Sequence, residues 1–333
     1  NYLIMGTVGA TFFVIGIGML YMVTGTLNMA DLAVRIAAHG DSSTVHMGFV
    51  FILIGIGLKL AMFPLHLWLP NAYSFAPSAV TAFLAATATK VAVYVMLRFM
   101  FTVFGFDYEF QAATLEMVVL PLAILAMFAA SLVAIFQDDL KRMLAYSSVA
   151  QIGYILLGLA FLTDTGLTAT IIHLFNHAVT KGALFMVAGC YVLMAGTSSI
   201  SGLRGVGRDM PWTPAAFVVA GFSLIGLPLT VGFISKWYLV QAALELGWWP
   251  VALLIMASSL LAIVYVWRVV ETAYLQPAPE GVTRKEAPPS MLIPVWILVA
   301  MSIWFGINAM TTSAAASRAA DMLIGSSQIL WED

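Results

Sequence analysis

Long apolar runs separated by short polar segments dominate the pattern of this chain. A helix needs about 20 apolar residues to cross the hydrocarbon core of a bilayer. By that criterion the sequence predicts nine spans, at residues 2–24, 45–62, 77–101, 115–135, 143–162, 166–195, 213–245, 249–272 and 290–310. The runs are continuous rather than alternating, and only helices or closed barrels cross lipid, so strands are a poor fit. The predicted fold is an all-α, polytopic membrane helix bundle.

Composition supports a chain built for the lipid bilayer. It is 62% hydrophobic and 9% charged, whereas a soluble domain is about half apolar and about a quarter charged. The net charge of -2 and the lack of a basic run give no reason to expect nucleic acid as a partner. The single cysteine, Cys190, excludes a disulfide framework and a Cys-ligated cluster or zinc site. We therefore treat residues 1–333 as a single membrane domain and predict no cofactor.

Basic residues favour one side of the predicted bundle. The loops on the side of the N-terminus carry Lys141, Arg142, Arg204, Arg208, Arg284 and Lys285, and the opposite side carries Arg35 and Arg318, with Arg98 near a span end. Positive charge marks the cytoplasmic face of membrane proteins. The sequence thus predicts a multi-pass protein of the cell inner membrane with its N-terminus in the cytoplasm.

Prolines interrupt two of the predicted spans. Pro64 follows the apolar run of the second span, and Pro228 lies inside the seventh. A proline removes a helical hydrogen bond and clashes with the preceding turn. Broken membrane helices often mark an ion or substrate site. A plain kink is the alternative at either proline.

Four of the six lysines lie inside apolar spans, and the other two, Lys141 and Lys285, are expected in loops. The four are Lys59, Lys90, Lys181 and Lys236. Each would cost about 2.5–3.5 kcal/mol at the centre of a membrane helix. A lysine near a span end can instead extend its side chain to the headgroups. The central positions of these residues favour a functional role in the interior.

Two histidines share a helix face with one of these lysines. His173, His177 and Lys181 follow one another at intervals of four residues, and residues four apart are neighbours on a helix surface. A single histidine is usually a hydrogen-bonded core residue, but three titratable groups in one stripe favour proton transfer. A metal site on the histidine pair is an alternative that lacks a third ligand.

Protons are the ions that these side chains suit best. Burial disfavours the charged form of an amine, and imidazole titrates near neutral pH, so a series of such groups bridged by water can pass protons. The carboxylates nearest the spans, Glu116, Glu245 and Glu271, lie toward span ends. A sodium site would usually require a central carboxylate, because hard cations prefer oxygen ligands.

Several stretches resemble the antiporter-like subunits shared by respiratory complex I, membrane-bound hydrogenases and Mrp-type cation/proton antiporters. They are Lys59 to Pro70, Asp139 to Ser148, His173 to Lys181, and Gly232 to Lys236, and together they extend over most of the chain in order.

The resemblance implies a bundle of about fourteen helices built as inverted repeats, of which this chain would hold the last nine. It implies that Lys59 is the central pumping lysine, that Lys90 is the connecting group, and that His173, His177 and Lys181 are relay groups. Lys236 would pass the proton onward. In the family a glutamate on an earlier helix pairs with the pumping lysine, and no span here supplies it, so we expect the intact protein to continue N-terminally by about five helices.

The predicted function is that of an ion-translocating subunit of a multisubunit complex, without redox chemistry of its own. The D-type subunit of an Mrp Na+/H+ antiporter is the first reading, and its partners would be other membrane subunits, protons and Na+. The alternative is a proton-pumping subunit of a complex I-like NADH:quinone oxidoreductase or a membrane-bound hydrogenase. A purely structural scaffold is the third reading, which the four buried lysines disfavour.

Overall fold

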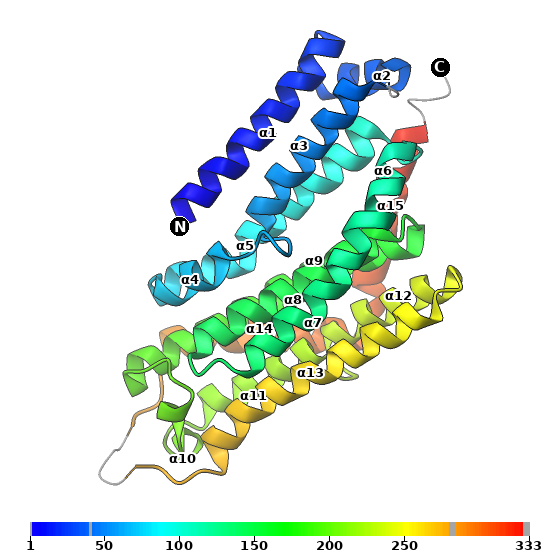
Figure 1. Cartoon of the computed structure of the whole chain (residues 1–333). Coiled ribbons are helices and arrows are strands. Elements are labelled where there is room, and N and C mark those ends of the chain that lie inside the picture. Colours follow the sequence, from blue (N-terminus) through cyan, green and yellow to red (C-terminus); the bar gives the residue numbers. More distant parts are fainter. Residues whose placement is uncertain (1, 40–41, 280–283, 329–333) are drawn as a thin grey trace.

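The computed structural model describes residues 2–39, 42–279 and 284–328, and these residues contain helices but no named strand (Figure 1). The first half of the bundle contains α1 (Tyr2–Thr24), α2 (Met29–His39), α3 (Ser43–Leu60), α4 (Trp68–Phe75), α5 (Ser78–Leu97), the π-helix η1 (Arg98–Phe104), α6 (Glu109–Thr114), the π-helix η2 (Leu115–Val119) and α7 (Leu120–Ile135). The second half contains α8 (Leu140–Ala160), α9 (Asp164–Ala195), η3 (Ser201–Leu203), α10 (Val206–Asp209), α11 (Trp212–Ile225), α12 (Val231–Glu245), α13 (Trp249–Tyr274), α14 (Pro289–Ile307) and α15 (Ala309–Gln328).

Eight helical segments of the described residues are long and apolar enough to cross a membrane. They match eight of the nine predicted spans. The remaining span, 213–245, is divided into α11 and α12, which have 14 and 15 residues. The prediction of about nine spans with two broken helices is confirmed, and the chain is a multi-pass membrane protein.

The two interruptions separate short helices from their partners. At the first, α3 ends at Leu60 and Ala61 takes a left-handed conformation with φ 62°, before α4 starts at Trp68. The indole of Trp68 donates a hydrogen bond of 2.7 Å to the Leu58 carbonyl and so satisfies part of the open helix end. At the second, Gly226 is left-handed with φ 91°, a conformation that costs glycine little. Each break leaves backbone carbonyls available to side chains.

Helices α8 and α9 form the centre of the bundle (Figure 1). Helix α9 has 32 residues and packs against α5, α8, α11, α12, α14 and α15. Helix α8 is buried along nearly its whole length. Helix α1, by contrast, lies at the edge and packs mainly on α3. Polar groups on α8 and α9 are therefore enclosed by protein, whereas the outer helices present apolar faces suited to lipid.

Small residues bring α1 and α3 into close contact. A Cβ atom at Gly55 would lie 2.6 Å from the backbone nitrogen of Phe13, and one at Gly16 would lie 2.6 Å from Ile52. Packing of this kind is common in membranes, where helix association depends on van der Waals contact rather than on the hydrophobic effect. The glycines of these helices thus fix the position of the segment that carries Lys59.

Two helices were not expected from the sequence. Helix α2 occupies the predicted loop around Arg35, buries Leu32 and Ile36, and carries an exposed ion pair of 2.9 Å between Arg35 and Asp31. Helix α15 occupies the tail after residue 310 and buries Ala316 and Ala320. Both are too polar to be found by a search for apolar runs, and both take their position from packing against the bundle.

The expectation of a solvated loop around Lys141 was wrong. Lys141 lies in the first turn of α8, is 6% exposed, and donates a hydrogen bond of 3.1 Å to the carbonyl of Ala76 at the end of α4. Asp139 caps the same helix by accepting a hydrogen bond of 2.8 Å from the Arg142 backbone N–H. The sequence suggested a polar turn, and the structure shows a helix start that packs against a broken helix.

The neighbouring loop is also fastened by polar contacts. The hydroxyl of Ser199 donates to Asp138 at 2.6 Å and is the largest cause that holds the pKa of this carboxyl below its ordinary value. Arg268, expected to be an interfacial anchor, donates to the carbonyls of Ile135 at 2.9 Å and Gln137 at 2.7 Å. Three segments that lie far apart in the sequence are thereby joined at one end of the bundle.

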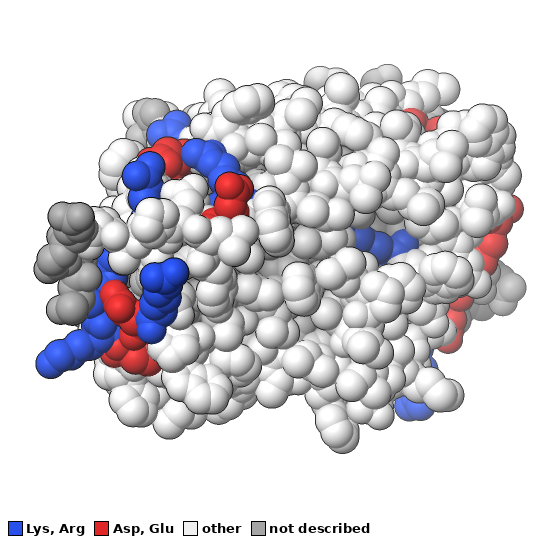
Figure 2. All heavy atoms as spheres, turned by 90° about the horizontal axis from the view of Figure 1, so that it is seen from below, with Lys and Arg blue, Asp and Glu red and all other residues white. Residues whose placement is uncertain are grey.

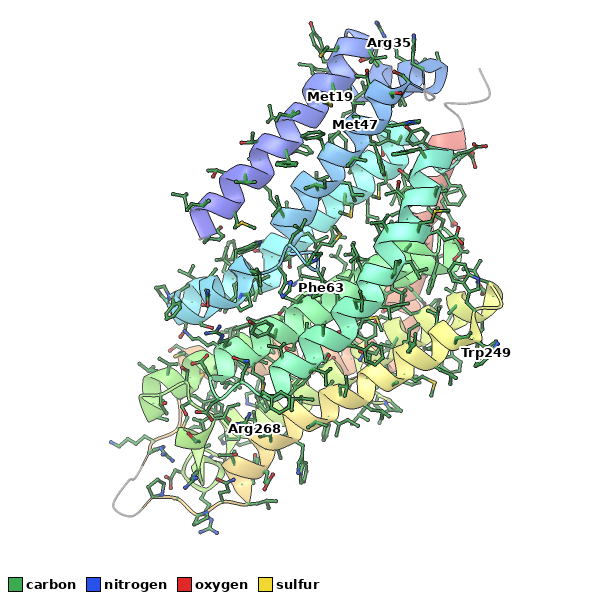
Figure 3. All side chains as sticks on the ribbon, in the orientation of Figure 1. Met19, Arg35, Met47, Phe63, Trp249 and Arg268 are labelled. Carbon is green, nitrogen blue, oxygen red and sulfur yellow. The ribbon has the colours of Figure 1, made fainter. Side chains whose placement is uncertain are left out.

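Charged side chains gather at the ends of the molecule (Figure 2). Arg35 lies at one end and Arg268 toward the other (Figure 3). Between the ends the visible surface is largely uncharged, except for basic atoms at the bottom of a hollow (Figure 2). This distribution is that of a protein whose middle faces hydrocarbon.

Candidate functional site

Helix α9 carries three of the predicted residues on one buried face. His173, His177 and Lys181 are 2%, 3% and 0% exposed. The two imidazole rings lie nearly parallel with centroids 6.4 Å apart. The Lys181 ammonium donates to the carbonyl of Leu144 at 2.9 Å and to the hydroxyl of Ser147, both on α8. The structure thus excludes lipid contact for all three groups.

Lys90 approaches this face from α5. Its side chain is 8% exposed, and its ammonium donates a hydrogen bond of 2.5 Å to the carbonyl of Ala85. The charge of Lys90 interacts electrostatically with His173, His177 and Lys181. The packing of α5 on α9 therefore places the connecting group beside the relay groups.

Lys236 lies on α12 and points at the broken end of α11. Its ammonium donates to the carbonyls of Leu224 at 3.2 Å and Ile225 at 2.7 Å. The carbonyl end of a helix carries a partial negative charge, which favours a cation there. A Cβ atom at Gly226 would lie 2.8 Å from Cδ of this lysine, so the glycine leaves room for the lysine stem.

Short polar and aromatic contacts link α9 to Lys236. Nδ1 of His173 and the hydroxyl of Ser235 are 2.8 Å apart, and Ser235 precedes Lys236 in sequence. The ring of Tyr154 on α8 lies 5.6 Å from the His173 ring and 4.8 Å from the Lys236 ammonium. Five of the six predicted groups therefore belong to one buried cluster around α9: Lys90, His173, His177, Lys181 and Lys236.

Lys59 is in a different environment. It lies in the last turn of α3, is exposed in this chain, and lines a cavity of about 790 Å³ between α1, α3 and α5. Thr87, Ala88 and Val91, which flank Lys90 on α5, line the same cavity. No ion pair among the described residues includes Lys59. The structure thus places Lys59 next to the helix of Lys90 but outside the buried cluster.

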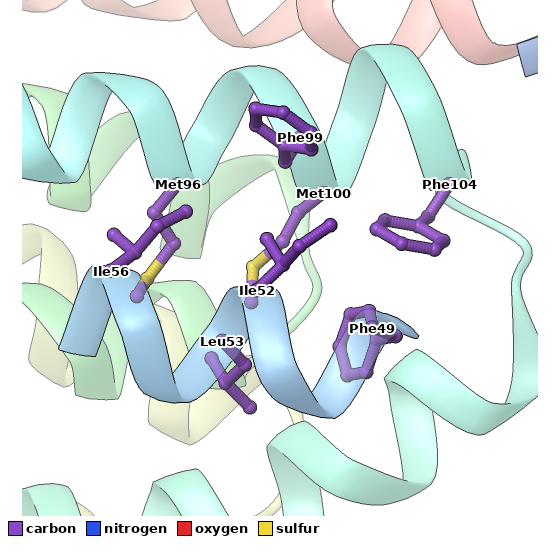
Figure 4. A pocket seen from close by; sticks show the side chains of 8 residues that line it. All are labelled: Phe49, Ile52, Leu53, Ile56, Met96, Phe99, Met100 and Phe104. Atoms are coloured by element: carbon purple, nitrogen blue, oxygen red, sulfur yellow. The ribbon is translucent and has the colours of Figure 1, made fainter. Parts of the chain in front are cut away.

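An apolar contact holds α3 against α5 and η1 near this lysine. Eight apolar side chains surround a small pocket of about 10 Å³, among them Phe49 and Ile52 from α3 and Met100 and Phe104 from η1 (Figure 4). The pocket is too small and too apolar to bind a polar ligand. Its tight packing fixes the distance between the helices of Lys59 and Lys90.

Several buried polar atoms in the cluster have no hydrogen-bond partner among the described residues. They are both ring nitrogens of His177, Nε2 of His173 and Oδ1 of Asn176. A buried polar atom without a partner costs about 1–3 kcal/mol, and ordered water is the usual partner in such places. The unpaired atoms follow the face of α9, where a proton path requires water.

Sequence reasoning missed the polar residues that support the cluster. Tyr154 and Ser147 come from α8, Asn176 lies between the two histidines, and Ser235 adjoins Lys236. Asn176 donates to the carbonyl of Val231 at 2.5 Å and so holds α9 against the start of α12. Helical spacing from His173 and from Lys236 would have found Asn176 and Ser235, whereas Tyr154 and Ser147 depend on how α8 packs.

The metal alternative gains no support. No group of three His, Cys, Asp or Glu side chains among the described residues is placed to hold a metal ion. The histidine pair instead has Lys90 and Lys181 as neighbours, and these cations would repel a metal ion. The arrangement suits proton transfer between nitrogen atoms.

Comparison with known proteins agrees with the fold and with this arrangement. The family described as NADH:quinone oxidoreductase/Mrp antiporter, TM, matches residues 1–262. The chain belongs to this family. It is 45% identical over 311 residues to "NADH-quinone oxidoreductase subunit N" of Desulforudis audaxviator, a match that covers 90% of this chain and 62% of the relative.

Two further matches come from antiporters of the Mrp type. The chain is 31% identical over 329 residues to the D-type subunit of the Na(+)/H(+) antiporter of Bacillus subtilis, which covers 97% of this chain and 65% of the relative. It superimposes on a chain of the Mrp complex from Dietzia sp. with a TM-score of 0.89 and 25% identity, covering 99% of this chain and 68% of that chain. The chain thus spans somewhat less than two thirds of the length of the two curated relatives from Desulforudis and Bacillus.

Proposed function

We propose that the chain is an ion-translocating subunit of a multisubunit membrane complex, and that a proton moves along Lys59, Lys90, the α9 face and Lys236. The observation that carries this proposal is the buried cluster of five protonatable groups around α9. Such groups are costly in a membrane protein and usually mark an ion path. A scaffold would be more stable with apolar side chains in the same places.

The chemistry requires each group to accept a proton from one neighbour and to release it to the next. A neutral amine or imidazole accepts a proton from a hydronium ion or from a bridging water, and the charged form later releases it. Two like charges at close range repel each other, so protonation of Lys90 favours the neutral forms of His177 and Lys181. Proton movement toward Lys236 relieves that repulsion, and the open carbonyls of α11 stabilise the charge where it arrives.

The parent complex has two candidates, each favoured by one observation. The 45% identity to a subunit N favours the proton-translocating membrane arm of an NADH:quinone oxidoreductase. The TM-score of 0.89 with a chain of an Mrp complex favours Na+/H+ antiport. In either complex the partners would be other membrane subunits, and the conformational or ionic coupling would come from them.

We also propose that residues 1–333 form a single membrane domain in the cell inner membrane, with the N-terminus of this chain in the cytoplasm. Helices α8 and α9 pack against both halves of the bundle, which supports a single domain. The excess of basic residues in the loops on the side of the N-terminus supports the orientation. Labelling of a cysteine placed between Arg204 and Arg208 from outside intact cells would contradict it.

The proposal is tested with the assembled parent complex in sealed vesicles. Lys90→Ala and Lys236→Ala should abolish proton translocation while assembly of the complex continues. Lys90→Arg and Lys236→Arg should also fail, because arginine keeps its proton at any accessible pH. Lys285→Ala is the matched control, since Lys285 is exposed in a loop. Normal translocation by either alanine variant would refute the proposed path.

The same vesicles distinguish the two parents. Proton uptake driven by a Na+ gradient, without electron donors, indicates antiport. Uptake that requires an electron donor and a quinone indicates a respiratory membrane arm.

A further inference from the structure

Tyr154 occupies a position between the α9 groups and Lys236 that packing alone does not require. Its side chain is 1% exposed on α8. The face of its ring lies 4.8 Å from the Lys236 ammonium, within the range of a cation–π interaction. The same ring lies 5.6 Å from the ring of His173. One aromatic side chain therefore contacts both ends of the last transfer in the proposed path.

The orientation of the Tyr154 ring is fixed from the far side. Its hydroxyl lies 3.3 Å from the hydroxyl of Ser259 and 3.5 Å from the carbonyl of Ile255, both on α13. These are long contacts, and they direct the hydroxyl away from the relay. The group that faces Lys236 is the ring, so the ring rather than the hydroxyl acts on the lysine.

The surroundings of Lys236 leave few other groups for this role. The helical ranges of α11 and α14 contain no titratable side chain. Helix α9 contributes His173, whose positive form repels Lys236, and on α13 Tyr265 interacts with Tyr154. On α11 the carbonyls of Leu224 and Ile225 accept hydrogen bonds from Lys236. The Tyr154 ring is thus the side chain that can favour the charged form of Lys236 without holding it by a salt bridge.

We propose that Tyr154 is a positioning residue, whose ring holds the charged Lys236 side chain at the broken end of α11 within reach of His173. An ion pair with a carboxylate would hold the proton too tightly for exchange, whereas an aromatic face stabilises the ammonium only moderately. When Lys236 releases its proton, the attraction to the ring is lost and the side chain is free to leave the carbonyls. This inference rests on the proposed function.

The test compares two substitutions of Tyr154 with a matched control. Tyr154→Phe keeps the ring and Tyr154→Leu removes it. Tyr191→Leu removes a fully buried tyrosine ring from α9, where no ring contact with a relay group is found among the described residues. Two readouts are taken: the pH profile of proton translocation by the assembled complex, and the titration of Lys236 by ¹⁵N NMR of lysine-labelled protein. The chain has six lysines, so the Lys236 signal is assigned by its loss in Lys236→Gln.

Tyr154→Leu should lower the titration midpoint of Lys236 by about 0.4 to 1.5 pH units, the effect expected for loss of a cation–π contact. The alkaline limb of the translocation profile should move in the same direction. Tyr154→Phe and Tyr191→Leu should leave both unchanged. An unchanged midpoint in Tyr154→Leu, or a shift as large in Tyr154→Phe, would overturn the inference.

Failure of the proposed function is recognised separately. Full translocation by Lys236→Gln would remove Lys236 from the path, whatever the NMR titration shows. A shifted midpoint in Tyr154→Leu would then still establish the contact between the ring and the ammonium.

Discussion

Gly232 gives the sharpest test of how α11 and α12 cross. A Cβ atom at this position would lie 1.8 Å from the carbonyl oxygen of Ser223 and 2.8 Å from the carbonyl carbon. Both are backbone atoms of α11, so no side-chain rotation can relieve the contact. Lys236 lies one turn further along α12 and donates to the end of the same α11. Any shift that accommodates a methyl group at Gly232 therefore also displaces Lys236.

The magnitude follows from the overlap. Insertion of extra carbon into a well-packed interior destabilises a protein by about 1–3 kcal/mol and occasionally more. A clash of 1.8 Å with backbone belongs at the upper end of that range. The preference of a helix for alanine over glycine, about 1 kcal/mol, acts in the opposite direction and is too small to compensate.

The assay is thermal unfolding of the purified complex in detergent, followed by size-exclusion chromatography, together with translocation in vesicles. Gly232→Ala should lower the unfolding temperature and the rate of translocation together. Gly18→Ala is the matched control, because a Cβ atom at Gly18 meets nothing within 4 Å. A Gly232→Ala variant as stable and as active as the wild type would show that α11 and α12 do not cross as described.

Two further predictions concern the end of the bundle that carries the basic loops. Lys141→Met should destabilise the protein by about 1–3 kcal/mol, because it leaves the Ala76 carbonyl without its donor, whereas Lys141→Arg should retain most of the stability; equal losses in chemical denaturation would contradict a capping role. The pKa of Asp138 is held below its ordinary value of 3.8, chiefly by the Ser199 hydroxyl, so the stabilisation it provides is complete well above that pH and disappears as the pH falls through the lowered pKa. Asp138→Asn should therefore reduce stability at neutral pH and flatten the loss of stability below about pH 4, and an acid-unfolding curve identical to that of the wild type would refute this.

The helix pattern was predictable because each span is a continuous apolar run whose length matches the bilayer. The prolines at 64 and 228 indicated the two breaks for the same local reason. Helices α2 and α15 were missed because their residues are mostly small or polar, and their place depends on contacts with η1, α9 and other distant segments. Lys141 was misplaced because a basic residue beside two aspartates resembles an exposed turn until α4 is brought next to it.

For the candidate site, the sequence identified residues that are costly in a membrane but not how they meet. The spacing of His173, His177 and Lys181 predicted their shared face from helical geometry alone. The contact between Lys236 and the α11 carbonyls required knowledge of where the α11 helix stops. Tyr154 carried no signal, since a tyrosine in an apolar helix is an ordinary core residue. The separate environment of Lys59, on a cavity rather than in the buried cluster, depends on how α1, α3 and α5 pack.

The most direct test of the central claim is a map of the intact complex in vesicles or nanodiscs that resolves ordered water along α9. The account predicts water bound to the unpaired nitrogens of His173 and His177, in a continuous chain that links Lys90 and Lys181 to His173 and Lys236, with gaps bridged by about one to three waters. It also predicts that water extends from Lys59 to Lys90 across the cavity between α3 and α5. Apolar side chains that close the space between Lys90 and His177, or a dry interior around the two histidines, would contradict the proposed proton path.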